Sequence, residues 1–259
     1  MVQGLDVFRE WFEEYPTRYV VIGGTACNLI LAQYGAPERA THDIDMVIVA
    51  ESFDDAFYRR FVSFIRQGGY QNKGKADKYV LYRFEKPSNK SFPPKIELLS
   101  KRPDHLEGIE TDLGRFQNID ATGSLSAILL DDEYYDLLDR GTEIVEGIPV
   151  LGLHYLPVFK IHAWANLRDA RAAGKSVHSD EINKHRRDVL RLCALFAPGT
   201  KITVPSSVVS EVRRFTRERP WDDNMMRNLG LRISADEMAD LIESSYVSAD
   251  EQLVENGAF

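Results

Sequence analysis

Hydrophobic positions in the first half of the chain follow two alternating patterns. Short runs of β-branched and aliphatic residues predict buried strands, and segments with apolar residues three or four positions apart predict helices. Strands are predicted over residues 18–22, 43–50, 78–84 and 95–99, with a small hairpin over 143–153. Helices are predicted over residues 5–15, 25–34 and 53–67. Thr25 is the expected N-cap of the second of these helices.

The second half of the chain has helical spacing alone. Helices are predicted over residues 157–173, 180–196, 206–218 and 234–246, bounded by proline, glycine or capping side chains. Interleaved strands and helices followed by helices alone favour an α/β (α+β) fold. We expect a small mixed-sheet domain over residues 1–155 and a helical domain over residues 156–259. Residues 100–125 have only weak periodicity, and we assign no structure to them.

Charge is unevenly distributed along the chain. The formal net charge of −8 argues against a protein that coats nucleic acid without specificity. Residues 160–219 nevertheless contain 13 basic and 6 acidic residues, whereas residues 220–259 contain 2 basic and 9 acidic residues. The basic stretch is compatible with a face for nucleotide phosphates or RNA, and equally with the solvated side of two helices.

Several classes of protein are disfavoured by the sequence. The longest apolar runs are too short to cross a bilayer, and the acidic N-terminal stretch does not resemble a signal peptide. We therefore expect a cytoplasmic protein with no membrane association. Cys27 and Cys193 lie singly in apolar helical patterns, which predicts buried, reduced thiols. The histidines lack the spacing of zinc enzymes.

Two aspartates at the start of a predicted strand are the first candidate for chemistry. Asp43 and Asp45 precede the apolar run MVIVA, and residues at i and i+2 of a strand point to the same face. Two neighbouring carboxylates repel each other unless a cation lies between them. Magnesium accepts such oxygen ligands and shares its coordination shell with substrate phosphates. The pattern therefore predicts a metal site, the alternative being a solvated strand end.

Two further features are consistent with a phosphate-handling site. Gly23 and Gly24 connect a predicted strand to a predicted helix, where glycine permits close approach of a ligand to free N–H groups. Glycines in such turns also serve purely steric needs. Glu97 lies inside the apolar strand KIELL, and it is either a third carboxylate beside Asp43 and Asp45 or an edge-strand side chain in water. Three carboxylates together can hold two divalent ions for phosphoryl transfer.

This order of motifs resembles the DNA polymerase β-like nucleotidyltransferase superfamily. The segment from Arg39 to Asp45, RATHDID, resembles the R-x-T-x-D-I-D segment of its AbiEii-type branch, which includes toxin and phage-defence enzymes. The branch also carries a helical Lys, then an Arg and a Lys-Asp-x-x-Asp stretch, similar here to Lys160, Arg168, Lys184 and Asp188. His185 replaces the first Asp of that stretch, and Thr25-Ala26 follows the glycines where many polymerase β-like enzymes have Gly-Ser. The resemblance covers about residues 19–195.

The resemblance implies transfer of a nucleoside monophosphate from an NTP, with pyrophosphate leaving. It implies that Asp43, Asp45 and Glu97 bind two Mg²⁺ ions. The implied nucleotide-binding residues are Gly23, Gly24, Thr25, Arg39, Thr41, Lys160, Arg168, Lys184 and Asp188. Two of them have simpler interpretations, since Lys160 is compatible with a snorkelling helix lysine and Asp188 with an ion pair to Lys184.

The sequence leaves the acceptor and part of the function open. An RNA such as a tRNA 3′ end would suit the basic helical segment and a toxin role with a cognate antitoxin. A small hydroxylated molecule, such as an aminoglycoside antibiotic, would suit an acidic cleft. The alternative from another class is a non-catalytic module that senses nucleotides through the same fold. A magnesium phosphohydrolase fits the glycine turn and the strand order less well.

Overall fold

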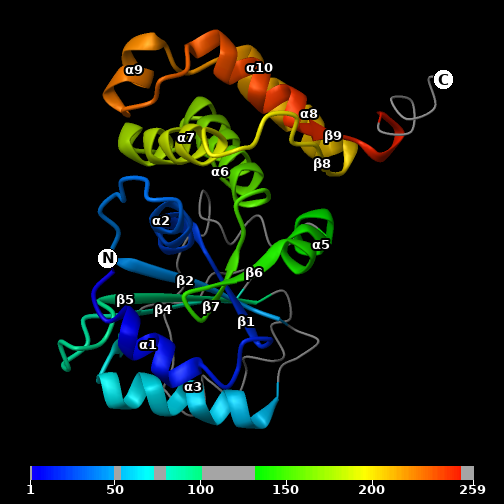
Figure 1. Cartoon of the computed structure of the whole chain (residues 1–259). Helices are drawn as coiled ribbons and strands as arrows, with labels where there is room; N and C mark the ends of the chain where they lie inside the picture. Colours follow the sequence, from blue (N-terminus) through cyan, green and yellow to red (C-terminus); the bar gives the residue numbers. More distant parts are fainter. Residues whose placement is uncertain (1, 50–53, 73–79, 101–131, 252–259) are drawn as a thin grey trace. The chain divides into compact units, whose positions relative to one another are not determined.

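The computed structural model describes residues 2–49, 54–72, 80–100 and 132–251 (Figure 1). The chain divides into two compact units, Met1–Gly152 and Leu153–Phe259. The first unit contains a mixed sheet with helices and the second is mainly helical, which confirms the predicted α+β class. No helix in the described ranges is long and apolar enough to cross a membrane.

The first unit interleaves its strands and helices, as the hydrophobic pattern predicts. Its described elements are α1 (Leu5–Phe12), β1 (Tyr19–Ile22), α2 (Gly23–Gln33), β2 (Asp43–Ile48), α3 (Asp55–Gly68), β3 (Gln71–Asn72), β4 (Val80–Glu85), β5 (Lys95–Ser100), α5 (Asp132–Gly141), β6 (Thr142–Val145) and β7 (Ile148–Leu151). The sequence pattern did not predict α5 or the two-residue strand β3.

Seven strands form one mixed sheet in the order β3-β4-β5-β2-β1-β7-β6. The interior strand β2 is antiparallel to β1 and parallel to β5, and β5 is antiparallel to β4. The predicted hairpin is confirmed as β6 and β7, which turn at Glu146 and Gly147 with positive φ angles of 50° and 81°. Because β5 lies between β4 and β2, Glu97 is not on an edge strand, and that alternative is wrong.

Aromatic side chains fill the core between the sheet and helices α1 and α3, which Figure 1 shows on the same side of the strands. The rings of Phe12 and Phe64 have centroids 5.1 Å apart, and Phe8 meets Tyr19 edge to face at 5.6 Å. Phe8, Phe12 and Phe64 are 0% exposed. Aromatic pairs in this geometry stabilise beyond their buried area, so the core holds the central strands firmly in register.

Helix α2 begins earlier than its sequence suggests. Its first residue is Gly23, directly after β1, and its N-cap is Ile22, which offers no side-chain hydrogen bond. The prediction of Thr25 as N-cap is wrong. Threonine resembles a cap in sequence, but here the hydroxyl of Thr25 donates to the backbone carbonyl of Asp43 at 2.5 Å. The helix start is thereby fixed to the first residue of β2.

The second unit consists of helices with a small pair of strands. Its described elements are α6 (Leu156–Ala172), α7 (Ser179–Cys193), β8 (Ile202–Thr203), α8 (Ser206–Glu218), α9 (Asp223–Asn228), α10 (Ala235–Ser245) and β9 (Tyr246–Val247). Helices α6, α7, α8 and α10 match the four predicted ones, whereas α9 and the parallel pair β8–β9 were not predicted. Cys27 and Cys193 are both buried and form no disulfide within the described residues, as expected.

Candidate functional site

Six charged residues on one face of three neighbouring strands form the candidate site, here called the charged cluster. The strand register places them in two rows, Glu85–Lys95–Asp43 and Arg83–Glu97–Asp45. Residues opposite each other in adjacent strands present their side chains to the same face. The register therefore brings Glu97 next to Asp43 and Asp45, from which it is distant in sequence. Ile44 and Ile96, which alternate with them, are fully buried.

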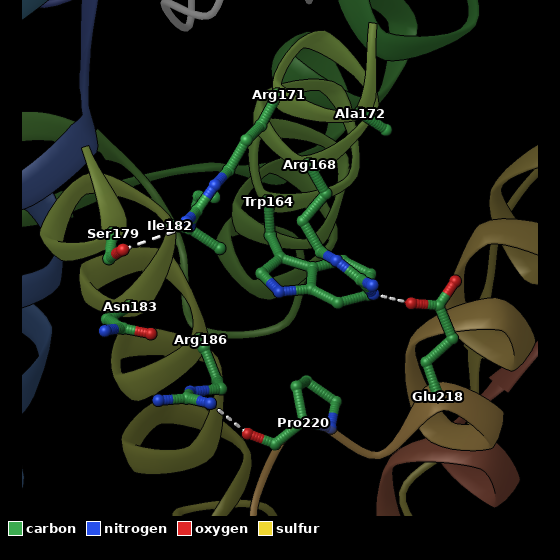
Figure 2. A pocket seen from close by; sticks show the side chains of 10 residues that line it. All are labelled: Trp164, Arg168, Arg171, Ala172, Ser179, Ile182, Asn183, Arg186, Glu218 and Pro220. Atoms are coloured by element: carbon green, nitrogen blue, oxygen red, sulfur yellow. Dashed lines mark hydrogen bonds and ion pairs between the residues drawn. The ribbon is translucent and has the colours of Figure 1, made fainter. Parts of the chain in front are cut away.

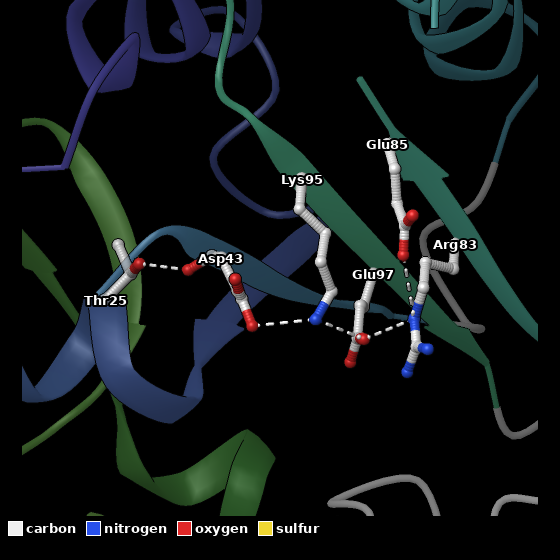
Figure 3. Close-up of polar contacts among 6 residues, drawn as sticks. All are labelled: Thr25, Asp43, Arg83, Glu85, Lys95 and Glu97. Carbon is white, nitrogen blue, oxygen red and sulfur yellow. Dashed lines mark hydrogen bonds and ion pairs between the residues drawn. The ribbon is translucent and has the colours of Figure 1, made fainter. Parts of the chain in front are cut away.

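Lys95 joins two of the predicted carboxylates. Its Nζ lies 2.7 Å from Oδ2 of Asp43 and 2.9 Å from Oε1 of Glu97, as Figure 3 shows. Burial alone would lower the pKa of Lys95, but the carboxylates of Glu97 and Asp43 outweigh this and raise it. The side chain is therefore an ammonium ion, and it lies between two of the three carboxylates predicted to hold metal.

Arg83 of β4 supports Glu97 from the other side. Its Nε donates to Oε1 of Glu97 at 2.7 Å and lies 4.0 Å from Oε1 of Glu85 (Figure 3). Glu97 is only 8% exposed. Burial would raise the pKa of its carboxyl, but Lys95 and Arg83 hold that pKa below its ordinary value. Glu97 is thus an ionised and firmly positioned carboxylate.

Asp45 has the opposite electrostatic environment. Its partners across the sheet are Ile22 and Glu97, so no basic residue lies directly opposite it. Burial, followed by the charges of Glu97 and Asp43, raises the pKa of Asp45 to about 8. At neutral pH Asp45 therefore carries a proton and makes a side-chain hydrogen bond with Glu97. A cation at this position would replace that proton.

The charged cluster suits a magnesium ion in ligand type and in charge, but it is not a ready-made metal site. Within the residues that the structure describes, no three His, Cys, Asp or Glu side chains converge as metal ligands. The ammonium of Lys95 occupies the space between Asp43 and Glu97. The remaining carboxyl of the three belongs to Asp45, whose pKa is raised, in a cluster of four acidic and two basic residues. Such oxygens are the ligands that magnesium prefers.

At positions 23 and 24, neighbouring side chains leave no room for a Cβ, so both residues must be glycine. A Cβ on Gly23 would lie 1.9 Å from Oδ2 of Asp45, and the residue has a positive φ of 71°. A Cβ on Gly24 would lie 2.6 Å from Oγ1 of Thr41 and 2.7 Å from a guanidinium nitrogen of Arg39. The two glycines thus let the start of α2 approach the carboxylate of Asp45 and the loop before β2.

Arg39 and Thr41 belong to the loop between α2 and β2. The backbone carbonyl of Arg39 accepts a hydrogen bond from the Asn28 amide at 2.7 Å, and its N–H donates back to Asn28 Oδ1 at 3.2 Å. The Arg39 guanidinium donates to the carbonyl of Ala40 at 3.1 Å. These contacts orient the loop that leads into Asp43. A role of Arg39 or Thr41 in binding phosphate stays a prediction.

A cavity of about 420 Å³ opens beside the charged cluster. Its charged lining comprises Asp43, Glu85, Lys86, Lys90 and Lys95, with His42 at the same opening. Binding sites for small ligands commonly have volumes of about 300–1,000 Å³. The cavity therefore has room for a phosphate-bearing ligand next to Asp43, with three lysines along its wall.

Lys160 and Asp188 form a sealed ion pair in the second unit. Lys160 Nζ lies 2.9 Å from Asp188 Oδ2, with the two side chains 1% and 0% exposed. Asp188 thus pairs with α6, whereas the sequence suggested a pair with Lys184 on its own helix. Lys184 is exposed on α7. Neither Lys160 nor Asp188 reaches solvent as it stands, and the nucleotide-binding role predicted for these three residues is untested.

Arg168 lines an open groove of about 1,060 Å³ in the second unit, shown in Figure 2. Its guanidinium lies 4.9 Å from the ring centre of Trp164 and makes an ion pair with Glu218. In the same groove Arg171 donates to Ser179 Oγ at 3.0 Å, and Arg186 donates to the carbonyl of Pro220. The arginines therefore already take part in contacts that join α6, α7 and α8.

Sequence reasoning missed Lys95 and Arg83 as members of the site. A basic residue that alternates with apolar ones in a strand is typical of a solvated face. The available signal was the spacing of Lys95, two positions before Glu97 and thus on the same face. Arg83 carried no such signal, because only the pairing of β4 with β5 places it opposite Glu97.

Comparison with known proteins yields distant structural neighbours. No family model and no curated protein matches the chain. Among solved structures, JHP933 from Helicobacter pylori is 12% identical with a TM-score of 0.44, over 98% of this chain and 94% of that one. The antibiotic-resistance factor ANT(2'')-Ia is 12% identical with a TM-score of 0.38, over 84% and 92%.

A CCA-adding enzyme in complex with ATP is 13% identical with a TM-score of 0.25, over 97% of this chain and 81% of that one. With TM-scores below 0.5, these neighbours assign this chain to no family and to no function.

Proposed function

We propose that the charged cluster is the catalytic centre of a magnesium-dependent nucleotidyltransferase. The observation that supports this most directly is the strand register, which sets Asp45 opposite Glu97 with Asp43 two residues away on the same face. Magnesium bound there would polarise the phosphoryl group and lower the pKa of the attacking hydroxyl. Asp43 and Asp45 would be its main ligands, with Glu97 completing the set.

The proposed reaction joins an acceptor to the α-phosphate of an NTP. The oxygen of an acceptor hydroxyl forms a bond to the α-phosphorus, and the bond from that phosphorus to the α–β bridging oxygen breaks. Pyrophosphate leaves, and the hydroxyl proton passes to solvent. Lys86 and Lys90, on the cavity wall beside Asp43, would offset charge on the triphosphate.

The glycines at the start of α2 would give the nucleotide access to backbone N–H groups. Gly23, Gly24 and Thr25 would act through the backbone, since the hydroxyl of Thr25 already donates to Asp43. Arg39 and Thr41 would position this loop against the phosphates. Arg168 and Lys184 keep a proposed part in nucleotide binding, and for Lys160 and Asp188 that part requires their buried pair to open.

The proposed acceptor is either an RNA such as tRNA or a small hydroxylated molecule. A toxin role with a cognate antitoxin, as in the AbiEii-type branch, belongs to the RNA version of the proposal. The basic stretch of residues 160–219 would suit RNA. Acceptor binding that weakens steeply with salt would support RNA, because phosphate contacts release counterions.

A transfer assay tests the activity. The protein is incubated with Mg²⁺ and each α-labelled NTP, together with total RNA, an aminoglycoside, a protein acceptor or no acceptor. We expect magnesium-dependent transfer of label with release of pyrophosphate, abolished by a chelator. A nucleotide sensor would instead be stabilised by NTP and Mg²⁺ against heat without releasing pyrophosphate. A folded protein that binds no NTP and transfers no label contradicts the proposal.

The variant Glu97→Gln tests whether the charge of Glu97 is needed for transfer, because it keeps the volume of the side chain and removes its charge. We expect the transfer rate to fall by about 10²-fold or more, since each tenfold loss corresponds to about 1.4 kcal/mol of transition-state stabilisation. Glu14→Gln is the matched control, because Glu14 is an exposed residue outside the charged cluster. Equal rates in the two variants would remove Glu97 from the catalytic centre.

A further inference from the structure

Lys95 lies where two neighbouring carboxylates would otherwise require a metal ion. Its ammonium is within 2.9 Å of both Asp43 and Glu97, so it neutralises the repulsion between those two side chains. Lys95 is part-buried on an interior strand, and its side chain is 24% exposed. These contacts make Lys95 part of the site.

The charges of the charged cluster indicate how many ions it needs. Asp43, Asp45, Glu85 and Glu97 are acidic, and Arg83 and Lys95 are basic, so the fully ionised cluster has a formal charge of −2. One divalent cation neutralises this charge, whereas two would leave an excess of +2. Charge buried without compensation is costly, so the count favours a single ion.

The uncompensated charge is concentrated at one position. Lys95 contacts Asp43 and Glu97, and Arg83 contacts Glu97 and Glu85. Asp45 is the acid that faces another acid directly across the sheet. A divalent cation therefore has its strongest attraction at Asp45, on the side of Glu97 away from Arg83.

We infer that Lys95 replaces one of the two metal ions, so that the protein alone binds a single divalent cation, at Asp45. The inference rests on the proposed function, and it revises the expectation of two protein-bound Mg²⁺ ions. Lys95 acts through Asp43 and Glu97 and is a positioning residue. It keeps the two carboxylates in place before metal and nucleotide arrive.

Manganese binding measured by electron paramagnetic resonance tests this inference. Free Mn²⁺ gives the signal and bound Mn²⁺ does not, so a titration without nucleotide counts the ions per chain. We expect one Mn²⁺ for the wild-type protein and two for Lys95→Gln. Arg59→Gln is the matched control, because it removes one positive charge from an exposed position on α3, and we expect it to bind one ion.

Heat stability provides a readout that does not depend on activity. In a chelator, Lys95→Gln should melt at a lower temperature than the control, because Asp43 and Glu97 lose their shared counterion. Mn²⁺ should then raise the melting temperature of Lys95→Gln more than that of the wild-type protein. If Lys95→Gln fails to fold, the number of Mn²⁺ ions bound by the wild-type protein still decides the test.

Two results would overturn the inference. One is a wild-type protein that binds two Mn²⁺ ions without nucleotide, and the other is an equal count for wild type and Lys95→Gln. Failure of the proposed function is a separate result, because it means that the wild-type protein transfers no nucleotide, whatever its ion count. A protein that transfers nucleotide while binding two ions refutes the role of Lys95 alone.

Discussion

Lys95 in the first unit and Lys160 in the second both contact an aspartate, and the two contacts differ in balance and exposure. Lys160 and Asp188 form one pair with side chains at most 1% exposed, in which a single positive charge meets a single negative one. Lys95 belongs to a cluster of four acids and two bases, and Asp43 beside it is 40% exposed. The sealed, balanced pair suits a structural role, whereas the open cluster with excess negative charge suits ligand binding.

The largest expected effect comes from removing the two aspartates of the charged cluster. For Asp43→Ala combined with Asp45→Ala, we expect nucleotide transfer to fall by roughly 10³-fold or more, because the main metal ligands are lost. The melting temperature in a chelator should stay constant or rise, since the variant no longer buries the Asp45 carboxyl, whose ionised form is disfavoured by burial and by Glu97. Transfer rates and thermal unfolding measure the two effects. A variant that unfolds but retains its activity per folded molecule would contradict the comparison.

Breaking the buried pair of Lys160 and Asp188 should instead lower the stability of the protein. Asp188→Leu or Lys160→Met alone should lower the free energy of unfolding by about 3–5 kcal/mol, because each leaves a buried charge without its partner. The double variant Lys160→Met with Asp188→Leu should recover most of this loss. Urea denaturation of the four proteins forms a double-mutant cycle. Losses below about 1 kcal/mol in both single variants would show that the pair is not sealed in solution.

The sequence predicted the central strands well, because each contains a run of β-branched and aliphatic residues bounded by glycine, proline or polar residues. It also singled out Asp43, Asp45 and Glu97 as candidates, since acids inside apolar strands are unusual, and the register places the three on one face. It could not supply the pairing of β2 with β5, which joins residues 52 positions apart, or of β4 with β5. Lys95 meets Asp43, and Arg83 meets Glu97, only through that register. The partner of Asp188 was missed because contacts between helices leave no local signal.

Gly23→Ala tests how closely the site is built around the start of α2. The new methyl would overlap Oδ2 of Asp45, and alanine disfavours the positive φ of this residue. We expect a loss of about 1–3 kcal/mol in the free energy of unfolding from the backbone conformation alone. Gly35→Ala is the control, because that glycine has a similar φ of 67° but open space at its Cβ. If Gly23→Ala loses no more free energy of unfolding than Gly35→Ala, the side chain of Asp45 moves aside freely.

The protonation of Asp45 predicts the smallest effect, a pH-dependent change in stability. Its pKa of about 8 in the folded protein exceeds the ordinary carboxyl value, so the folded state holds the proton more tightly than the unfolded chain. Its contribution to stability is therefore fully present below about pH 4 and is lost as the pH rises to about 8. Asp45→Asn should remove this dependence.

Melting temperatures of the wild-type protein and Asp45→Asn between pH 5 and pH 9, in a chelator, measure the difference. The advantage of Asp45→Asn should grow towards pH 8 and then level off. With metal present, the wild-type protein should release a proton on binding below about pH 8, so its affinity for metal should rise with pH. A constant difference between the two proteins across this range would contradict a raised pKa of Asp45.

The missing side chain of Gly23 also has an evolutionary consequence. Because a Cβ at this residue would lie 1.9 Å from Oδ2 of Asp45, the glycine and the aspartate impose a single steric requirement. A larger residue at position 23 becomes acceptable only after the side chain at position 45 shortens, and the main ligand for the proposed metal then disappears. Among homologues that keep this sheet, we therefore expect the two positions to change together, and expect active descendants to inherit both residues unchanged.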